Sequence, residues 1–373
     1  MRVLYVAQNI RVPGTHGGST HVVEVTRALR RHHDVTLIAR RGSTGQGVVG
    51  IGLGTAPGIL RYAVALLLFP TAYRYARLCR PDVIYERYSS FGLGVLLGRA
   101  LNVPVVSMIL NESATKWSLS GADALVATMP EIVPERYRHK VVEVSWGANV
   151  EMFRPDVDAR DLRLRLGFDV DETVIGYAGG FYSWHGLDTL VESAALLAKD
   201  PRAPRLRYLL VGDGEQRKSI EAAIARSGIA DRFVLVGTVP YEEVPRYVAA
   251  SDIGMACYNP AAHPQFRRRF FFDPLKVFEY MASGRATVTV DSPNMRKMFT
   301  DRKHALLVRP GDAAALARAT LDLATNIDLR RRLAEEGRRL VVDRYSWETH
   351  ANHLGAIFSR VTSARSDRRN ENS

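Results

Sequence analysis

Cysteine is scarce in this sequence, which has two in 373 residues, Cys79 and Cys257. They lie far apart, neither belongs to a Cys-x-x-Cys pair, and no histidine cluster stands beside them. The sequence therefore indicates neither a disulfide framework nor a zinc site. This usage is typical of a reducing compartment, so we expect a cytoplasmic location.

Long hydrophobic runs are also missing. The most apolar segment, residues 59–69, contains Arg61 and is far shorter than the roughly 20 residues that span a bilayer. The first residues form a strand pattern at once, Arg2 to Ala7, without the architecture of a signal peptide. We expect neither a transmembrane helix nor secretion.

Acidic residues are outnumbered, 39 against 51 lysines and arginines, for a formal net charge of +12. Nucleic acid, anionic lipid and a nucleoside diphosphate are all partners that suit this excess. The sequence has no zinc-finger spacing, no RNP-like aromatic pattern and no basic region followed by heptads. We therefore do not expect nucleic acid to be the partner.

What the sequence does have is an alternation of short apolar strands and helices, present in both halves of the chain. Its length suggests two or three domains. A polar run with several aspartates, through residue 171, is interpreted as a linker, and residues 42–58 as a loop. The pattern predicts an α/β fold of two doubly wound domains facing across a cleft, residues 1–150 and 151–345, with a last helix at 346–362 and a disordered tail at 363–373.

The stretch from Asp273 to Gly284 holds the strongest local signal. Pro274 suits the first position of a helix, and Gly284 suits its end. Lys276 and Glu279 are three residues apart and would share one face, near free backbone N–H groups. A phosphate binds such donors together with a cation, and a carboxylate binds ribose hydroxyls. The alternative is an ordinary surface ion pair.

Polar residues also follow strands in the first half. Gly17 and Gly18 form a turn between a strand and a helix, where a ligand can approach the backbone. Glu86, Arg87 and Asn111 lie at the ends of later strands, where open α/β sheets bind ligands. Each residue has an alternative role in a tight turn or a local hydrogen bond.

The segment from 59 to 78 reads as an amphipathic helix with arginines at its margins. Its apolar face is predicted to contain Ile59, Tyr62, Ala63, Leu66, Tyr73, Ala76 and Arg77. Packing inside a domain and contact with a membrane surface are both open to such a helix.

A set of short motifs runs in one order along nearly the whole chain: Gly17-Gly18 with His21, Trp146-Gly147-Ala148-Asn149 with Phe153 and Pro155, Gly179 with Trp184-His185-Gly186, Val211-Gly212-Asp213-Gly214, Lys276 with Glu279-Tyr280-Met281-Ala282 and Gly284, and Ser346-Trp347. The ordered set resembles the retaining glycosyltransferases of family four, the group that includes glycogen synthases and mannosyltransferases. Tyr85-Glu86-Arg87-Tyr88 and Asn111 look like a bacterial and archaeal branch. The resemblance implies the GT-B fold of two Rossmann-like domains, with the last helix crossing back to the first.

The resemblance also implies roles for particular residues. Glu279 would bind the ribose of a nucleotide sugar, and Gly18 would close over its phosphates. The other donor-binding positions would be Gly180, Gly212, Phe272, Pro274, Leu275 and Lys276. The acceptor would lie near His16, His21, Glu86 and Asn111.

Three positions depart from the family pattern. Phe271 stands where the first of two glutamates is common, Gly180 where an arginine is common, and His185 where a lysine is common. Lys276, His185 or one of Arg267 to Arg269 would compensate, and Asp273 would contact the donor sugar. The catalytic candidates are therefore His185, Lys276 and Asp273.

No metal is expected, although two Asp-x-Asp runs, at 156–158 and 169–171, imitate a metal-binding motif. They fall in the predicted linker. The resemblance implies that helix N-termini and cations stabilise the leaving diphosphate instead.

The sequence thus predicts a retaining transferase that moves a sugar from a nucleoside diphosphate to an acceptor hydroxyl, with no cofactor beyond that co-substrate. The acceptor would be a cell-surface glycan or a glycolipid precursor, reached at the inner membrane face. A nucleotide-sugar epimerase and a non-catalytic nucleotide-sugar-binding subunit are the alternatives.

Overall fold

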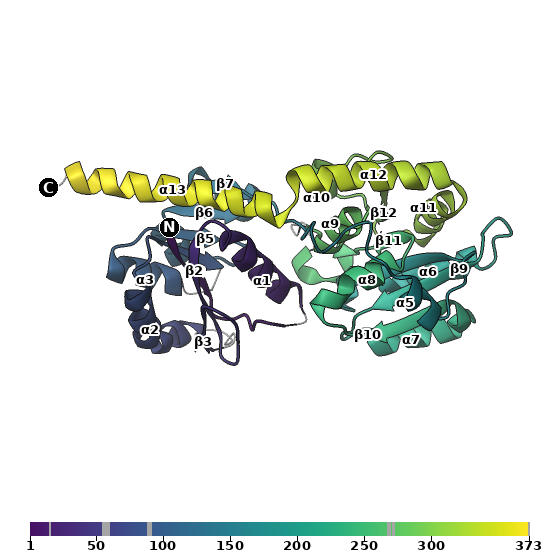
Figure 1. Ribbon diagram of the computed structural model, residues 1–373, viewed down its shortest axis with the longest axis horizontal. Helices are drawn as coiled ribbons and strands as arrows, with labels where there is room; N and C mark the ends of the chain where they lie inside the picture. Colours follow the sequence, from purple (N-terminus) through teal and green to yellow (C-terminus); the bar gives the residue numbers. More distant parts are fainter. Residues whose placement is uncertain (15, 54–59, 88–91, 267–269, 271–272, 372–373) are drawn as a thin grey trace. The chain divides into compact units, whose positions relative to one another are not determined.

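The computed structural model describes residues 1–373 except 15, 54–59, 88–91, 267–269, 271–272 and 372–373. The chain divides into two compact units (Figure 1). Unit 1 consists of Met1–Trp146 and Trp347–Ser373, and unit 2 of Gly147–Ser346. The last helix of the chain therefore belongs to the N-terminal unit.

Unit 1 is built on a parallel sheet with the strand order β3-β2-β1-β4-β5-β6-β7. Its helices and strands are β1 (Arg2–Ala7), α1 (Gly17–Leu29), β2 (Asp34–Arg40), β3 (Val48–Gly52), α2 (Leu60–Cys79), β4 (Val83–Arg87), α3 (Leu93–Leu101), β5 (Val105–Met108), α4 (Lys116–Gly121), β6 (Ala124–Ala127), β7 (Val141–Glu143) and α13 (Trp347–Glu371). The order reverses direction between β1 and β4, as in a doubly wound fold.

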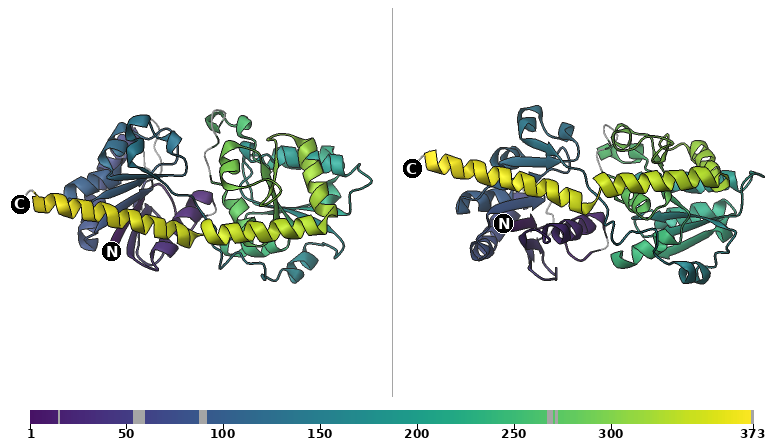
Figure 2. Two further views of the ribbon diagram at one scale, coloured as in Figure 1. Left: turned by 90° about the horizontal axis from the view of Figure 1, so that it is seen from above. Right: turned by 45° about the horizontal axis from the view of Figure 1, so that its top comes forward.

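The two faces of this sheet are covered by different helices because side chains alternate along a strand. Leu4 and Ile84 pack in a core with α2 and α3. Tyr5 and Tyr85, one residue further along, point to the other face, where their ring centroids lie 4.8 Å apart. Phe358 of α13 lies 5.7 Å from Tyr85 on that face, and α13 runs beside α1 (Figure 2).

Unit 2 repeats the plan with the parallel order β10-β9-β8-β11-β12-β13. Its helices and strands are α5 (Arg160–Arg165), β8 (Thr173–Ala178), α6 (Leu187–Leu197), β9 (Leu206–Val211), α7 (Arg217–Arg226), β10 (Phe233–Gly237), α8 (Val244–Ala249), β11 (Ile253–Ala256), α9 (Leu275–Ala282), β12 (Ala286–Val290), α10 (Pro293–Met298), β13 (Leu306–Val308), α11 (Ala313–Thr325) and α12 (Ile327–Arg344). The predicted α/β class and the two doubly wound domains are confirmed.

Two glycines let helices approach this second sheet closely. A Cβ at Gly176 of β8 would lie 2.0 Å from Ser251 Oγ, and one at Gly254 of β11 would lie 2.4 Å from Tyr280 Cγ. Helices α8 and α9 therefore sit directly on the backbone of these strands. The neighbouring side chains Ile175 and Tyr177 point into the opposite core, which they share with α6, α7 and α11.

Three local predictions are wrong, and a fourth, the buried face of α2, is only partly right. The loop expected at 42–58 contains the edge strand β3. The run interpreted as a linker lies inside unit 2, where Arg163 of α5 donates to the carbonyl of Ala250 and to Asp252. The tail expected to be disordered from residue 363 continues α13 to Glu371. In α2, the sheet-facing residues are Ala65, Leu68, Ala72 and Ala76.

This last correction leaves part of the predicted apolar face of α2 on the outside. Leu66 and Arg77, both expected on the buried face, are exposed, and Leu67 is 72% exposed. The cause is that leucine and alanine alternate around this helix, so periodicity alone does not separate the two faces. Alanines at the sheet side allow a close approach and leave the longer side chains outside.

Candidate functional site

The predicted donor stretch forms a short helix that packs on β11 and β12 of the second sheet. Helix α9 begins at Leu275, and Pro274 is its N-cap residue, one position earlier than predicted. Phe278 is buried and stacks on Tyr345, with ring centroids 4.9 Å apart. Gly284 follows with a φ of +64°, a left-handed conformation that glycine adopts without strain. The first turn of α9 therefore holds Lys276 in a fixed place.

Lys276 is buried against aromatic side chains. Its Nζ donates to the hydroxyl of Tyr177 at 3.0 Å and lies 4.2 Å and 5.0 Å from the ring centroids of Tyr177 and Tyr258. Burial lowers the pKa of the Lys276 ammonium to about 7, although the charge of Glu279 favours the protonated form. The attraction between the ammonium and the faces of the aromatic rings makes up only part of the hydration that the ammonium loses on burial. An anion bound beside Nζ would favour the charged lysine.

His185 supports the turn that follows β8. Its Nδ1 hydrogen-bonds to the carbonyl of Gly180, which fixes Nδ1 as a donor, and lies 2.9 Å from the hydroxyl of Tyr177. Tyr177 also donates to the carbonyl of Gly180 at 2.6 Å. Burial and the nearby Lys276 hold the pKa of the His185 imidazole well below its usual value, so His185 is neutral. It shapes the Gly180 turn and adds no positive charge.

Glu279 is buried one turn further along α9. The hydroxyl of Tyr241 donates to Glu279 Oε1 at 3.4 Å. Lys276 and Glu279 thus lie on one buried helix face, and the alternative of an exposed surface ion pair is wrong for both.

Glycines bring backbone close to the lysine. A Cβ at Gly179 would lie 2.9 Å from Lys276 Nζ, and one at Gly212 would lie 2.0 Å from the carbonyl oxygen of Gly179. Both glycines have a positive φ. The ends of β8 and β9 therefore stack tightly beside Lys276 only because no side chain is present.

The other donor candidates are only partly placed. Asp273 is buried and Leu275 is half-buried. Phe272, together with Phe271 and Arg267 to Arg269, lies outside the described residues.

The Asp-x-Asp runs belong to ion pairs: Asp158 pairs with Arg160, and Asp169 and Asp171 pair with Arg205.

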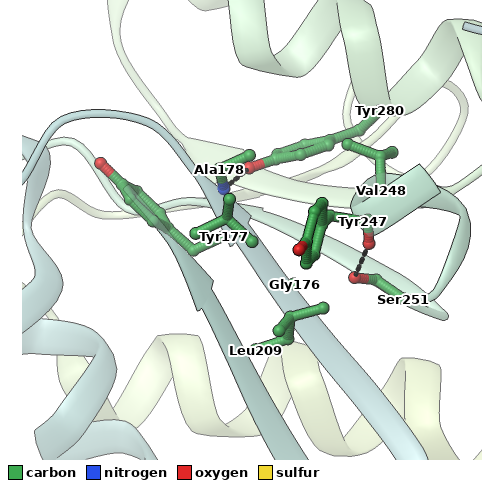
Figure 3. Close-up of a pocket in the computed structure, with 9 residues that line it drawn as sticks. Gly176, Tyr177, Ala178, Leu209, Tyr247, Val248, Ser251 and Tyr280 are labelled. Carbon is green, nitrogen blue, oxygen red and sulfur yellow. Dashed lines mark hydrogen bonds between the residues drawn. The ribbon is translucent and has the colours of Figure 1, made fainter. Parts of the chain in front are cut away.

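A small cavity lies between β8 and helices α8 and α9. It is lined by Gly176, Tyr247, Ser251 and Tyr280 among others, and Tyr280 accepts a hydrogen bond from Ala178 N at 2.8 Å (Figure 3). Its volume is about 10 Å³, which is room for one water molecule. The cavity is far too small for a sugar nucleotide.

In unit 1 the predicted acceptor residues take different places. His16 is exposed and caps α1, accepting a hydrogen bond from Ser19 N at 3.2 Å. Asn111 follows β5, and its side chain accepts from the amide and hydroxyl of Ser113. His16 is exposed, and Asn111 is half-buried.

Glu86 and His21 are buried instead. Glu86 Oε1 accepts from Gly94 N in the first turn of α3 at 3.0 Å. His21 lies in a cluster with Trp146, Trp347 and His350, and its ring centroid is 4.7 Å from that of Trp146. The contact with Gly94 accounts for the burial of Glu86, whereas both ring nitrogens of His21 are buried without a hydrogen-bond partner among the described residues.

Three tyrosines that contact Lys276 or Glu279 were not predicted from the sequence. Tyr177 and Tyr258 surround Lys276, and Tyr241 contacts Glu279. Tyr177 stands in a strand of β-branched and aromatic residues, where a tyrosine is ordinarily a core residue. Its hydroxyl was the missed signal, because a buried tyrosine hydroxyl usually requires a partner.

Comparisons with known proteins match both units. The family model described as "Glycosyltransferase Family 4" matches residues 15–130, and "Glycosyl transferases group 1" matches residues 172–326. The chain is 24% identical over 224 residues to alpha-D-kanosaminyltransferase of Streptomyces kanamyceticus, covering 60% of this chain and 55% of that protein. The matches span about half the length of the curated relatives.

Two solved structures share the architecture over nearly the whole chain. Sucrose-phosphate synthase from Thermosynechococcus elongatus superposes with a TM-score of 0.75 at 20% identity, covering 97% of this chain and 99% of that one. HepE of Anabaena, in complex with UDP and glucose, superposes with a TM-score of 0.74 at 15% identity, covering 96% and 99%. At these sequence identities the similarity shows a shared fold and nothing further.

Proposed function

Because the chain belongs to glycosyltransferase family 4 and has the GT-B fold, we propose that it transfers a sugar from a nucleoside-diphosphate sugar to an acceptor hydroxyl, with retention of configuration. The observation that carries this proposal is the pair Lys276 and Glu279, buried on one face of α9 beside glycine turns. HepE, which shares the fold, binds UDP. The pair has the two chemistries that a nucleotide sugar needs, a cation for phosphate and a carboxylate for ribose.

In this proposal the donor lies on unit 2. Lys276 and the first turn of α9 bind the diphosphate, and Glu279 accepts hydrogen bonds from the ribose hydroxyls. The turns at Gly180 and Gly212 let the phosphates approach the backbone, and Asp273 contacts the donor sugar. His185, held neutral, keeps the Gly180 turn in place.

The chemistry needs no nucleophilic side chain. The bond between the anomeric carbon and the diphosphate oxygen breaks, and its electron pair leaves with the diphosphate. The acceptor oxygen attacks from the same face, and its proton passes to the leaving diphosphate. The residues around Lys276 contribute by stabilising the negative charge on the leaving group, an effect that is usually a large term in catalysis.

The acceptor is assigned to unit 1, near His16 and Asn111. A cell-surface glycan or glycolipid precursor in the cytoplasm fits this assignment. Helix α2 supports a peripheral contact with the inner membrane face, because Leu60, Leu66, Leu67 and Leu78 are between 61% and 73% exposed, and Arg74 and Arg77 are exposed among them. Exposed leucines flanked by arginines suit an anionic lipid surface. In the part of the chain that the structure describes, no helix is long and apolar enough to cross a bilayer.

Flotation with anionic vesicles tests the membrane contact. We expect the protein to float at low salt, and a Leu66→Ser/Leu67→Ser variant to remain at the bottom. Leu164→Ser, which changes an exposed leucine of α5, is the control and should float like the wild type. Equal flotation of all three proteins would show that the exposed leucines of α2 do not make the membrane contact.

Turnover of a donor tests the transferase proposal. The protein is incubated with nucleoside-diphosphate sugars and candidate acceptors, and the released nucleotide and the configuration of the product are measured. An α-linked product from an α-linked donor supports a retaining transferase. Isomerisation of the donor sugar without an acceptor would support an epimerase, and tight donor binding without turnover would support the non-catalytic subunit.

A further inference from the structure

Tyr177 joins the two helical layers of unit 2 at the carboxyl end of β8. Its ring packs in the core with Phe181 and Leu187, on the face of the sheet that α6 covers. Helix α9 lies on the other face, directly over Gly254. The Tyr177 hydroxyl nevertheless reaches the first turn of α9, where Lys276 Nζ donates to it at 3.0 Å. Tyr177 thus connects a core on one face of the sheet with the helix on the other.

The hydrogen bonds of the Tyr177 hydroxyl fix its direction. Its single proton is donated to the carbonyl of Gly180 at 2.6 Å, and Nδ1 of His185, which carries a proton, lies 2.9 Å from its oxygen. Burial raises the pKa of Tyr177 well above its usual value, so the hydroxyl keeps its proton. Toward Lys276 the hydroxyl therefore presents a lone pair, and Nζ has to be the donor.

The same hydroxyl determines where Nζ lies. Among the described residues it is the hydrogen-bond partner of Nζ, whose other neighbours are the ring faces of Tyr177 and Tyr258. Nζ also lies against the half-buried turn after β8, because a Cβ at Gly179 would be 2.9 Å from it. An ammonium has three N–H donors, and one of them points to Tyr177. That leaves two for a ligand at this turn.

The described groups that face Lys276 are neutral except for Glu279. His185 of the turn is uncharged, and burial raises the pKa of Cys257 and Tyr258 at the end of β11, so both keep their protons. Glu279, on α9 itself, favours the ammonium but does not offset the cost of burial. Lys276 therefore loses its charge more readily than an exposed lysine, and a bound anion restores it.

We propose that Tyr177 is a positioning residue of the donor site, which holds Lys276 Nζ against the Gly179 turn so that the diphosphate and a proton bind there together. The identity of the ligand rests on the proposed function. Without a ligand, Nζ is largely uncharged at pH 8 and is kept in place by the hydroxyl. When the diphosphate binds, Nζ takes a proton from the solvent and donates to phosphoryl oxygens, while its bond to Tyr177 remains.

Calorimetric titration of the full chain with UDP, GDP, ADP and dTDP tests the proton uptake. For the nucleotide that binds, we expect the affinity to fall by up to about tenfold per pH unit above pH 7. At pH 8, binding should take up close to one proton per nucleotide, measured in two buffers that differ in ionisation enthalpy. Lys276→Met should bind more weakly and take up no proton.

Tyr177→Phe tests the positioning, because it keeps the ring and removes the hydroxyl. We expect it to weaken the nucleotide about tenfold and to move the pH midpoint of binding down by about half a unit, since a hydroxyl stabilises an ammonium more than an amine. Tyr208→Phe is the matched control and should change neither quantity. It removes a buried hydroxyl of β9 that lies in the same core and has no partner among the described residues.

Two results would overturn the proposal. If Tyr177→Phe lowers the Tm but leaves the affinity and the pH midpoint unchanged, the tyrosine only packs the core. If Tyr208→Phe weakens binding as much as Tyr177→Phe, the loss follows a loosened core rather than the bond to Lys276.

A double-mutant cycle without ligand separates this proposal from the proposed function. If Tyr177 holds Lys276, Tyr177→Phe should lower the Tm less in a Lys276→Met background than in the wild type. If no nucleotide binds the wild type but this difference appears, the transferase proposal fails and Tyr177 still positions Lys276. Equal losses of Tm in the two backgrounds would contradict the role of Tyr177, whichever nucleotide binds.

Discussion

Burial controls the charge of Lys276 near neutral pH. Its folded pKa of about 7 lies below the value of 10.5 for an exposed lysine, mainly because of burial. Between these two values the unfolded chain holds a proton that the folded protein does not, so this residue makes stability rise with pH. Below pH 7 both states are charged, and the full cost of burying the ammonium is present. The difference corresponds to at most about 5 kcal/mol.

Lys276→Met should therefore stabilise the protein most at low pH. We expect a gain in the free energy of unfolding at pH 6 that shrinks as the pH rises toward 10, measured by urea unfolding. Lys199→Met, at an exposed position, is the matched control and should show no such trend. A gain that does not vary between pH 6 and 10 would show that Lys276 keeps an ordinary pKa.

Around α9, the sequence predicted the relative placement of Lys276 and Glu279 but not the tyrosines that contact them. The spacing of Lys276 and Glu279 predicted their common face, because helical geometry is local. The tyrosines that contact them come from β8, from the segment before α8 and from the end of β11, up to 99 residues away. Such contacts depend on the order of the strands in the sheet. The spacing of residues within one segment does not reveal that order.

At the scale of elements, the placement of α9 depends on Gly254. The ring of Tyr280 lies directly over this glycine of β11, and the hydroxyl of Tyr280 accepts from Ala178 N. Gly254→Ala should push α9 away from the sheet and cost about 1–3 kcal/mol of stability, because the added methyl group has no room. Nucleotide affinity should fall as well, since Lys276 and Glu279 move with the helix.

A double-mutant cycle checks the cause of this effect. In a Tyr280→Ala background the methyl group has space, so Gly254→Ala should cost much less than in the wild type. Both chains are compared by chemical denaturation. An equal cost in the two backgrounds would mean that the backbone of β11, rather than its contact with α9, requires glycine.

Elements with strong periodicity were predicted well and weakly patterned ones were not. Helix α9 spans Leu275–Ala282, between the Pro274 and Gly284 signals that predicted it. The edge strand β3 was missed because Val48 to Gly52 is rich in glycine, which is uncommon in strands. The buried face of α2 was predicted only in part: Ala76 is buried, but Leu66 and Arg77 are exposed, because apolar residues surround the helix.

At the scale of the whole molecule, the repeated α/β alternation was sufficient to predict two doubly wound units. The sequence did not predict that α13 continues to Glu371, since its last turns are polar and carry no apolar stripe. Nor did it show that the aspartate-rich run is part of unit 2. That run is held by ion pairs and by Arg163, two of whose partners, Ala250 and Asp252, lie more than 80 residues away.

The central claim is that unit 2 binds a nucleoside diphosphate through Lys276 and Glu279. The most direct measurement is calorimetric and thermal-shift titration with UDP, GDP, ADP and dTDP on the wild type, on Glu279→Ala and on Glu192→Ala, a control at an exposed glutamate of α6. We predict that one nucleotide stabilises the wild type and the control, and that Glu279→Ala loses this response. Binding that survives in Glu279→Ala, or no binding of any of the four nucleotides, would contradict the account.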